Sequence, residues 1–162
     1  MTPIKVYLAG PDVFYPNARE LADSAREKAA GLGIHALIPI DNDIGATSPA
    51  EMSREIFEAN VKMIREADAV IANLSPFRGP SADAGTVWEV GFAHALGKPV
   101  IGYSTDLRDY KERVVEPDGM LIEDFGNIDN LMIAHALAAV VGTLEDAFQA
   151  LLTHRLGGLK NG

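Results

Sequence analysis

Short apolar runs alternate with amphipathic helical segments along most of this chain, and this alternation constrains its fold more than any other feature. The runs have the length of β-strands, and they are expected at residues 4–9, 34–40, 69–74 and 100–103, with a short edge strand at 120–122. Parallel strands need long crossover connections, which are usually helices. The alternation therefore predicts parallel βαβ units.

Helices are expected between and after these strands, at residues 17–32, 49–67, 86–96, 130–139 and 143–152. The second helix has the clearest start, because Ser48-Pro49-Ala50-Glu51 is a capping box with proline at the first helical position. Gly33 and Gly97 mark the ends of the first and third helices. No repeat, low-complexity tract or linker divides the 162 residues, so a single domain (1–162) is expected.

Right-handed crossovers favour an α/β fold of the flavodoxin-like, doubly wound type, with a five-stranded parallel sheet in the order 2-1-3-4-5 flanked by helices. Ligands of such sheets bind outside the carboxyl ends of strands one and three, where the strand order reverses. Those ends carry Gly10-Pro11-Asp12 and Asn73-Leu74-Ser75-Pro76. The loop that begins at Ser75 leads to two carboxylates, Asp83 and Glu89.

Asp83 and Glu89 are the strongest candidates for chemistry. We expect Glu89 near the start of a helix, where the helix dipole favours the ionised carboxylate. An ionised carboxylate can attack an anomeric carbon and form a glycosyl ester that an acceptor then displaces with net retention. The alternatives are structural: Glu89 would only complement the dipole, and Asp83 would only cap the helix.

Three further polar residues allow both a functional and a structural interpretation, and a fourth only a structural one. Tyr7, near the carboxyl end of the first strand, can orient a carboxylate or be an ordinary buried tyrosine. Asn60 lies on the apolar stripe of its helix and needs hydrogen-bond partners, from the protein or from a ligand. Asp43 follows the second strand and serves either a turn or a bound heterocycle. Asn130 is interpreted as a helix N-cap.

Composition excludes several classes of function. The net charge is −9 without a basic cluster, so nucleic acid is not an expected partner. There is no cysteine, and the four histidines have no ligand spacing, so neither a metal site nor a cofactor is expected. No apolar run approaches the roughly 20 residues that span a bilayer, and no signal peptide is seen. We therefore expect a cytoplasmic protein without a membrane partner.

Five motifs together resemble the nucleoside 2-deoxyribosyltransferases, in order and in spacing. They are Tyr7-Leu8-Ala9-Gly10-Pro11, Ile38-Pro39-Ile40-Asp41-Asn42, the apolar strand 69–74 followed by Ser75-Pro76-Phe77-Arg78-Gly79, Asp83-Ala84-Gly85-Thr86-Val87-Trp88-Glu89-Val90-Gly91, and Asn130-Leu131-Met132. The resemblance covers about residues 4–152. It implies a flavodoxin-like fold and transfer of a 2-deoxyribosyl group from a deoxynucleoside to a free nucleobase.

The resemblance also implies roles for individual residues. Glu89 would be the nucleophile that attacks C1′, Tyr7 would position it, and Asp83 would contact a sugar hydroxyl. The pocket that binds the substrate would include Gly10, Asp12, Phe14, Asp43 and Asn60. Asn130 and Met132 would reach into the site of a neighbouring subunit and hold the 5′ end of the sugar, which implies a homo-oligomer.

One residue departs from the family pattern. Asn60 stands where many members have an aspartate that handles the proton of the leaving base, and an amide cannot donate that proton as an acid. Two alternatives therefore stay open: an N-glycosidase that hydrolyses deoxynucleoside 5′-monophosphates, for which Arg78 is a possible phosphate contact, and a non-catalytic nucleoside-binding protein.

Overall fold

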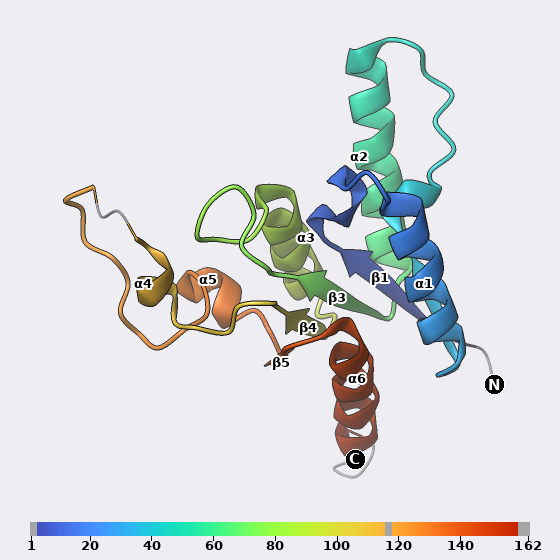
Figure 1. Cartoon of the computed structure of the whole chain (residues 1–162). Coiled ribbons are helices and arrows are strands. Elements are labelled where there is room, and N and C mark those ends of the chain that lie inside the picture. Colours follow the sequence, from blue (N-terminus) through green and yellow to red (C-terminus); the bar gives the residue numbers. More distant parts are fainter. Residues whose placement is uncertain (1–2, 116–117, 159–162) are drawn as a thin grey trace.

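The computed structural model describes residues 3–115 and 118–158 and contains a parallel sheet with helices on both faces (Figure 1). The sheet has five strands in the order β2-β1-β3-β4-β5, all parallel, which confirms the predicted topology. The strands are β1 (Ile4–Ala9), β2 (Ile34–Leu37), β3 (Ala69–Asn73), β4 (Val100–Tyr103) and β5 (Ala139–Val141).

Two layers of helices cover the sheet, α1 and α6 on one face and α2 and α3 on the other (Figure 1). The helices are α1 (Ala18–Ala30), α2 (Pro49–Glu66), α3 (Ala84–Ala95), α4 (Tyr110–Arg113), α5 (Leu131–Ala134) and α6 (Leu144–Gly158), with 3-10 turns η1 (Pro11–Phe14) and η2 (Pro39–Asp41). Successive residues of a strand point to opposite faces. Val6 therefore packs in the core under α1 and α6, while its neighbour Tyr7 packs in the core under α2 and α3.

The central strand and the best-capped helix form as the sequence dictates. Every residue of β3 is buried, as expected of a strand with neighbours on both edges and helices on both faces. At the start of α2, the Ser48 hydroxyl accepts a hydrogen bond of 3.3 Å from the Glu51 amide. Pro49 occupies the first turn, where its missing N–H costs no hydrogen bond.

The fifth strand is not where the sequence pattern predicted it. Residues 120–122 form no strand, and β5 is Ala139–Val141, which pairs in parallel with β4. The predicted helix 130–139 is correspondingly reduced to α5. The alanine-rich stretch after α5 has the composition of a helix, but Val140 and Val141 are β-branched and a free sheet edge lies beside them, so tertiary pairing overrides local propensity.

The second strand is also shorter than predicted. It ends at Leu37, and Pro39 opens η2. Proline has no N–H to donate to a neighbouring strand, and this accounts for the early end. The adjacent strands β1 and β3 are in register from Val6 and Ala69 to Ala9 and Ala72, which brings Gly10 and Asn73 together at the carboxyl edge of the sheet.

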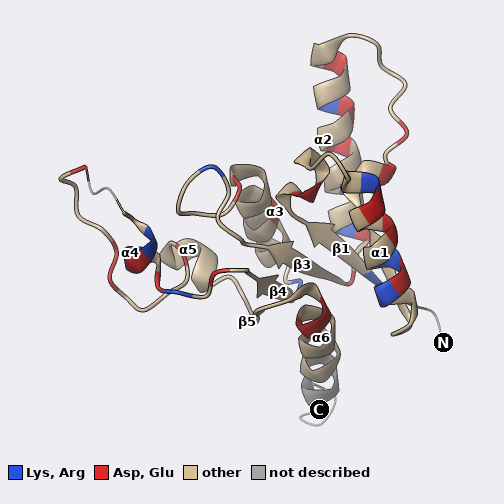
Figure 2. Cartoon of the chain, viewed as in Figure 1, with Lys and Arg blue, Asp and Glu red and all other residues tan. Residues whose placement is uncertain are grey.

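Among residues 3–115 and 118–158, no helix combines the length and the apolar character that a membrane crossing requires. Acidic and basic side chains are interspersed along α1 and α2 (Figure 2).

Candidate active site

The centre of the candidate site is a hydrogen bond between a strand and a helix. The Tyr7 hydroxyl, from β1, donates to the Glu89 carboxylate, from α3, at 2.6 Å. Tyr7 is fully buried, and Glu89 lies on the side of α3 that faces the sheet. The short contact between residues 82 positions apart brings together the two side chains that the resemblance assigned to nucleophile and positioning roles.

Burial dominates the electrostatics of this pair. It raises the pKa of Glu89 to about 7, while the hydrogen bond from Tyr7 lowers it and the charge of Asp83 raises it. The pKa of Tyr7 is raised far above its usual value by burial and then by Glu89, so the phenol remains a hydrogen-bond donor. Near neutral pH the Glu89 carboxyl is therefore divided between its protonated and ionised forms.

We expected the helix dipole to favour the ionised form of Glu89, but the position of Glu89 in α3 does not support this expectation. The helix begins at Ala84, so Glu89 is its sixth residue and has left the first turn, where the dipole acts most strongly. Asp83 is the residue at the helix start. Its carboxylate accepts hydrogen bonds from the Thr86 amide at 3.0 Å and the Thr86 hydroxyl at 3.1 Å, so Asp83 caps α3 and also places a negative charge near Glu89.

Side-chain hydrogen bonds join the segments that follow the carboxyl ends of β1 and β3. The Asn73 amide donates to the Asp12 carboxylate at 3.1 Å, and the Ser75 amide donates to the Asn73 side-chain oxygen, also at 3.1 Å. A Cβ atom on Gly10 would lie 2.5 Å from Asp12 Oδ2 and 2.9 Å from Asn73 Cβ. Glycine is required here by close packing. Asn73 was not predicted as a site residue, although its position at the end of the central strand pointed to this edge.

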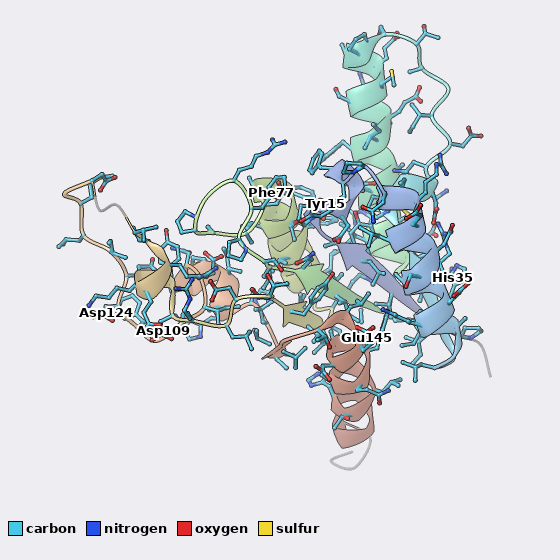
Figure 3. All side chains as sticks on the ribbon, in the orientation of Figure 1. Tyr15, His35, Phe77, Asp109, Asp124 and Glu145 are labelled. Atoms are coloured by element: carbon cyan, nitrogen blue, oxygen red, sulfur yellow. The ribbon has the colours of Figure 1, made fainter. Side chains whose placement is uncertain are left out.

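Aromatic side chains link η1 to the loop after β3. Phe14, exposed at the end of η1, stacks on Phe77 with ring centres 5.6 Å apart, and the Arg78 guanidinium lies over both rings. Arg78 has a positive φ of 55°, which a non-glycine residue adopts uncommonly. Phe77 lies in the loop after β3 (Figure 3). The sequence contained no spacing signal that linked Phe77 to Phe14, because their contact depends on strand order.

The two predicted base contacts come from different parts of the chain, Asn60 from the second half of α2 and Asp43 from the connection that precedes α2. Asn60, half-buried, accepts a hydrogen bond of 2.8 Å from the Asn42 amide, which is the structural partner that its position required. Asp43 is exposed in the connection between η2 and α2. Asn60 thus retains donor capacity for a ligand after its protein contact is made.

Asn130 and Met132 lie at the start of α5, which packs against α3. The Asn130 side-chain oxygen accepts from the Met132 amide at 3.0 Å, so the residue is an N-cap as expected, and its amide group donates to Glu123 at 2.6 Å. Met132 is 75% exposed. A groove between α3 and α5 is lined by Ala82, Val87, Met132 and other residues.

The opposite face of the sheet holds a separate cavity of about 230 Å³ beneath α1. Its apolar lining includes Leu8 and Ile71, and it shares Gly10 and Asp12 with the candidate site. Tyr7 and Glu89 do not line it. Over the part of the chain that the structure describes, no three metal-ligating side chains cluster.

Known proteins resemble this chain over nearly its whole length. A 2-deoxyribosyltransferase from Leishmania mexicana superimposes with a TM-score of 0.78 at 39% identity, covering 94% of this chain and 99% of the other. A 2-deoxyribosyltransferase from Bacillus psychrosaccharolyticus gives a TM-score of 0.62 at 26% identity, with coverages of 89% and 90%. An uncharacterized protein of Schizosaccharomyces pombe is 31% identical over 91% of this chain and 86% of its own length.

The sequence pattern that describes nucleoside 2-deoxyribosyltransferases matches residues 6–132, a range that includes Tyr7, Asp83 and Glu89. The parallel sheet in the order 2-1-3-4-5 agrees with the fold of the Leishmania mexicana enzyme. On this evidence, the chain is an enzyme that belongs to the nucleoside 2-deoxyribosyltransferase family.

Proposed function

We propose that this enzyme transfers a 2-deoxyribosyl group between nucleobases through a covalent intermediate on Glu89. The observation that carries the proposal is the partly buried Glu89 carboxylate, held at 2.6 Å by Tyr7, which comes from β1. A nucleophilic carboxylate needs a fixed orientation and shielding from water, and this arrangement supplies both.

The reaction proceeds by two displacements at C1′. Ionised Glu89 attacks C1′ of the deoxynucleoside, the bond from C1′ to the base nitrogen breaks, and the base leaves with the bonding electrons and takes up a proton. A nitrogen of the acceptor base then attacks C1′ of the glycosyl ester, loses its proton, and releases the Glu89 carboxylate. Each step inverts C1′, so the product retains the original configuration.

The surrounding residues hold the two substrates. Asp83, fixed by its hydrogen bonds to Thr86, accepts a hydrogen bond from a sugar hydroxyl. Gly10, Asp12 and Phe14 line the pocket beside the carboxyl end of β1, and Asp43 contacts the base. Asn60 hydrogen-bonds the base while it remains bonded to Asn42. Because an amide is not an acid, the proton for the leaving base comes from water or from Asp43.

We propose that the active enzyme is a homo-oligomer in which Asn130 and Met132 complete a neighbouring site. Support comes from apolar side chains that a single chain leaves exposed. Trp88 is 47% and Phe57 is 53% exposed, their ring centres are 5.4 Å apart, and Phe92 stacks on Trp88 at 5.1 Å. A contiguous exposed aromatic surface of this kind marks a protein interface.

The proposal is tested by incubating the protein with a deoxynucleoside and an isotopically labelled acceptor base, followed by chromatography of the products. We expect a labelled deoxynucleoside from the wild-type protein and none from Glu89→Gln. Mass spectrometry of the wild-type protein with donor alone should detect a deoxyribosyl adduct on the peptide that contains Glu89. Full activity of Glu89→Ala would refute the covalent mechanism.

One observation favours a second candidate, hydrolysis of deoxynucleoside 5′-monophosphates. The Arg78 guanidinium lies 5.6 Å from the centre of the ring of Phe14, a proposed pocket residue, and a guanidinium there can contact a phosphate. The negative charge of the Asp12 carboxylate would repel a phosphate and argues against this candidate. Comparing a deoxynucleoside with its monophosphate, each with and without acceptor base, separates the two: the hydrolase releases base from the monophosphate without an acceptor.

A further inference from the structure

Asp129 is a buried carboxylate to which the sequence pattern assigned no role. It is 1% exposed and lies directly before α5. Its Oδ1 accepts hydrogen bonds from the Ser81 hydroxyl at 2.5 Å and from the Asn130 amide at 2.8 Å, and its Oδ2 accepts from the Ala82 amide at 2.9 Å. A buried carboxylate is tolerated only when its oxygens are bonded in this way.

These contacts join the entrances of two helices. Ala82 immediately precedes Asp83, the cap of α3, which carries Glu89. Asn130 caps α5, which carries Met132. One side chain therefore holds the segment that shapes its own subunit's site and the segment assigned to the neighbouring subunit's site.

Arg113 supplies the compensating charge for this carboxylate. Its guanidinium is almost fully buried and lies 3.9 Å from Asp129 Oδ2. Its nitrogens make no hydrogen bond among the residues that the structure describes, and its guanidinium forms an ion pair with Asp129. Moving the carboxylate away would leave a buried charge without its partner. The energetic cost of that unpaired charge holds the carboxylate in place.

We propose that Asp129 is a positioning residue that couples two sites, because it holds Asp83 beside the Glu89 of its own subunit and Asn130 beside the substrate of the next. The inference rests on the proposed function. A shift of Asp129 would move both helix entrances together, so the Asp83–Glu89 geometry and the neighbour-facing segment change in concert.

Asp129→Asn is the direct test. The amide has one acceptor oxygen in place of two, and its NH₂ group would face a backbone N–H. We expect kcat/KM for deoxyribosyl transfer to fall about 10²-fold, the loss that a misplacement of about 1 Å produces. Ser81→Ala removes only the hydroxyl arm and leaves the carboxylate buried and bonded. We expect this variant to have the melting temperature of the wild type, which would show that it folds normally. Its kcat/KM should fall about fivefold.

Mixed oligomers distinguish coupling from a general structural role. In a 1:1 mixture of Asn130→Ala and Glu89→Gln subunits, about a quarter of the shared sites combine an intact Glu89 with an intact Asn130, so transfer should reappear. In a mixture of Asp129→Asn and Glu89→Gln subunits, every intact Glu89 stands beside a displaced Asp83, and we expect little recovery. Glu89→Gln alone is the baseline for both mixtures.

Each outcome decides the proposal. Wild-type kcat/KM in Ser81→Ala and Asp129→Asn, or equal recovery in the two mixtures, would overturn it. So would full activity of Asn130→Ala alone, because the neighbouring segment would then be dispensable. Failure of the proposed function has a different signature, namely no transfer by the wild-type protein with any donor and acceptor.

Discussion

The Tyr7 phenol and the Glu89 carboxylate are joined by a 2.6 Å hydrogen bond between the first strand and the third helix. This bond opposes the effect of burial, which raises the pKa of Glu89 to about 7. A carboxylate withdrawn from water is less stabilised by solvent, and the hydrogen bond keeps a usable fraction of it ionised. The ionised fraction of Glu89 therefore depends on its neighbours Tyr7 and Asp83.

The pH dependence of kcat/KM should report the ionisation of Glu89 in the free enzyme. We expect a plateau above about pH 7 and a tenfold fall for each unit below it, because only the ionised form attacks C1′. Tyr7→Phe removes the hydrogen bond that lowers this pKa and should shift the profile to higher pH. Asp83→Asn keeps a capping side chain but removes a negative charge, and should shift the profile to lower pH. Identical profiles for all three proteins would contradict this assignment.

Glu89→Gln should stabilise the protein at neutral and alkaline pH. The folded pKa of Glu89 is raised from 4.5 to about 7, so the folded state binds the proton more tightly than the unfolded state. The free energy of unfolding of the wild type therefore loses up to about 3 kcal/mol between pH 4.5 and pH 7 through this group. Glutamine does not titrate and so removes that loss. The free energy of unfolding of Glu89→Gln, relative to the wild type, should therefore rise between pH 4.5 and pH 7 and stay constant at higher pH.

Denaturant unfolding at several pH values measures this stability difference. Glu27→Gln, which replaces an exposed carboxylate on α1, is the matched control and should show no such growth. A gain for Glu89→Gln that is already complete at pH 4.5 would show that ionisation is not its cause.

Asn60→Asp should accelerate transfer from donors whose leaving base needs a proton. Aspartate keeps an oxygen that accepts from Asn42 and adds an acid at the same position. General acid catalysis is typically worth 10²–10⁴-fold, and we expect a gain of about tenfold or more. Initial rates with several donor bases check this, with Asn60→Ala as the variant that loses the protein contact. A slower Asn60→Asp enzyme would show that the proton arrives from another direction.

Gly10→Ala should weaken both the fold and the site. The added Cβ would lie 2.5 Å from Asp12 Oδ2 and 2.9 Å from Asn73 Cβ, so the hydrogen bond between Asp12 and Asn73 must shift. We expect a loss of about 1–3 kcal/mol in the free energy of unfolding, as for other overpacked sites, together with a higher KM for the deoxynucleoside.

Gly45→Ala is the control for this substitution, because a Cβ at Gly45 meets no atom within 4 Å. It should change the free energy of unfolding by less than about 0.5 kcal/mol. Equal melting temperatures for the Gly10 and Gly45 variants would contradict the packing argument.

The sheet order was predictable because the first four strands are apolar runs of ordinary length and the crossovers have one favoured hand. The fifth strand was not, since Ala139–Val141 is short and follows an alanine-rich stretch. The alanine-rich composition before it favours a helix, and the β-branched Val140 and Val141 form a strand because the edge of β4 is open to pair with them.

In the site, strand order placed Tyr7 and the loop after β3 at the same edge of the sheet, and the family resemblance implied that Tyr7 pairs with Glu89. The ionisation of Glu89 did not follow, because a pKa depends on burial and on the start of the helix, which lies at Ala84. Asp129 was missed for the same kind of reason. Its partners Ser81 and Ala82 are 48 and 47 residues away in the sequence.

Trp88 is the only tryptophan of the chain, and it is the residue immediately before Glu89. Its indole is half-exposed, stacks on Phe92, and meets the Phe57 ring at a tilt of 59°. The emission of an indole responds to its surroundings, so the intrinsic fluorescence of the unlabelled protein reports on the helix that carries Glu89. Substrate binding and subunit association can therefore be followed optically with no probe added.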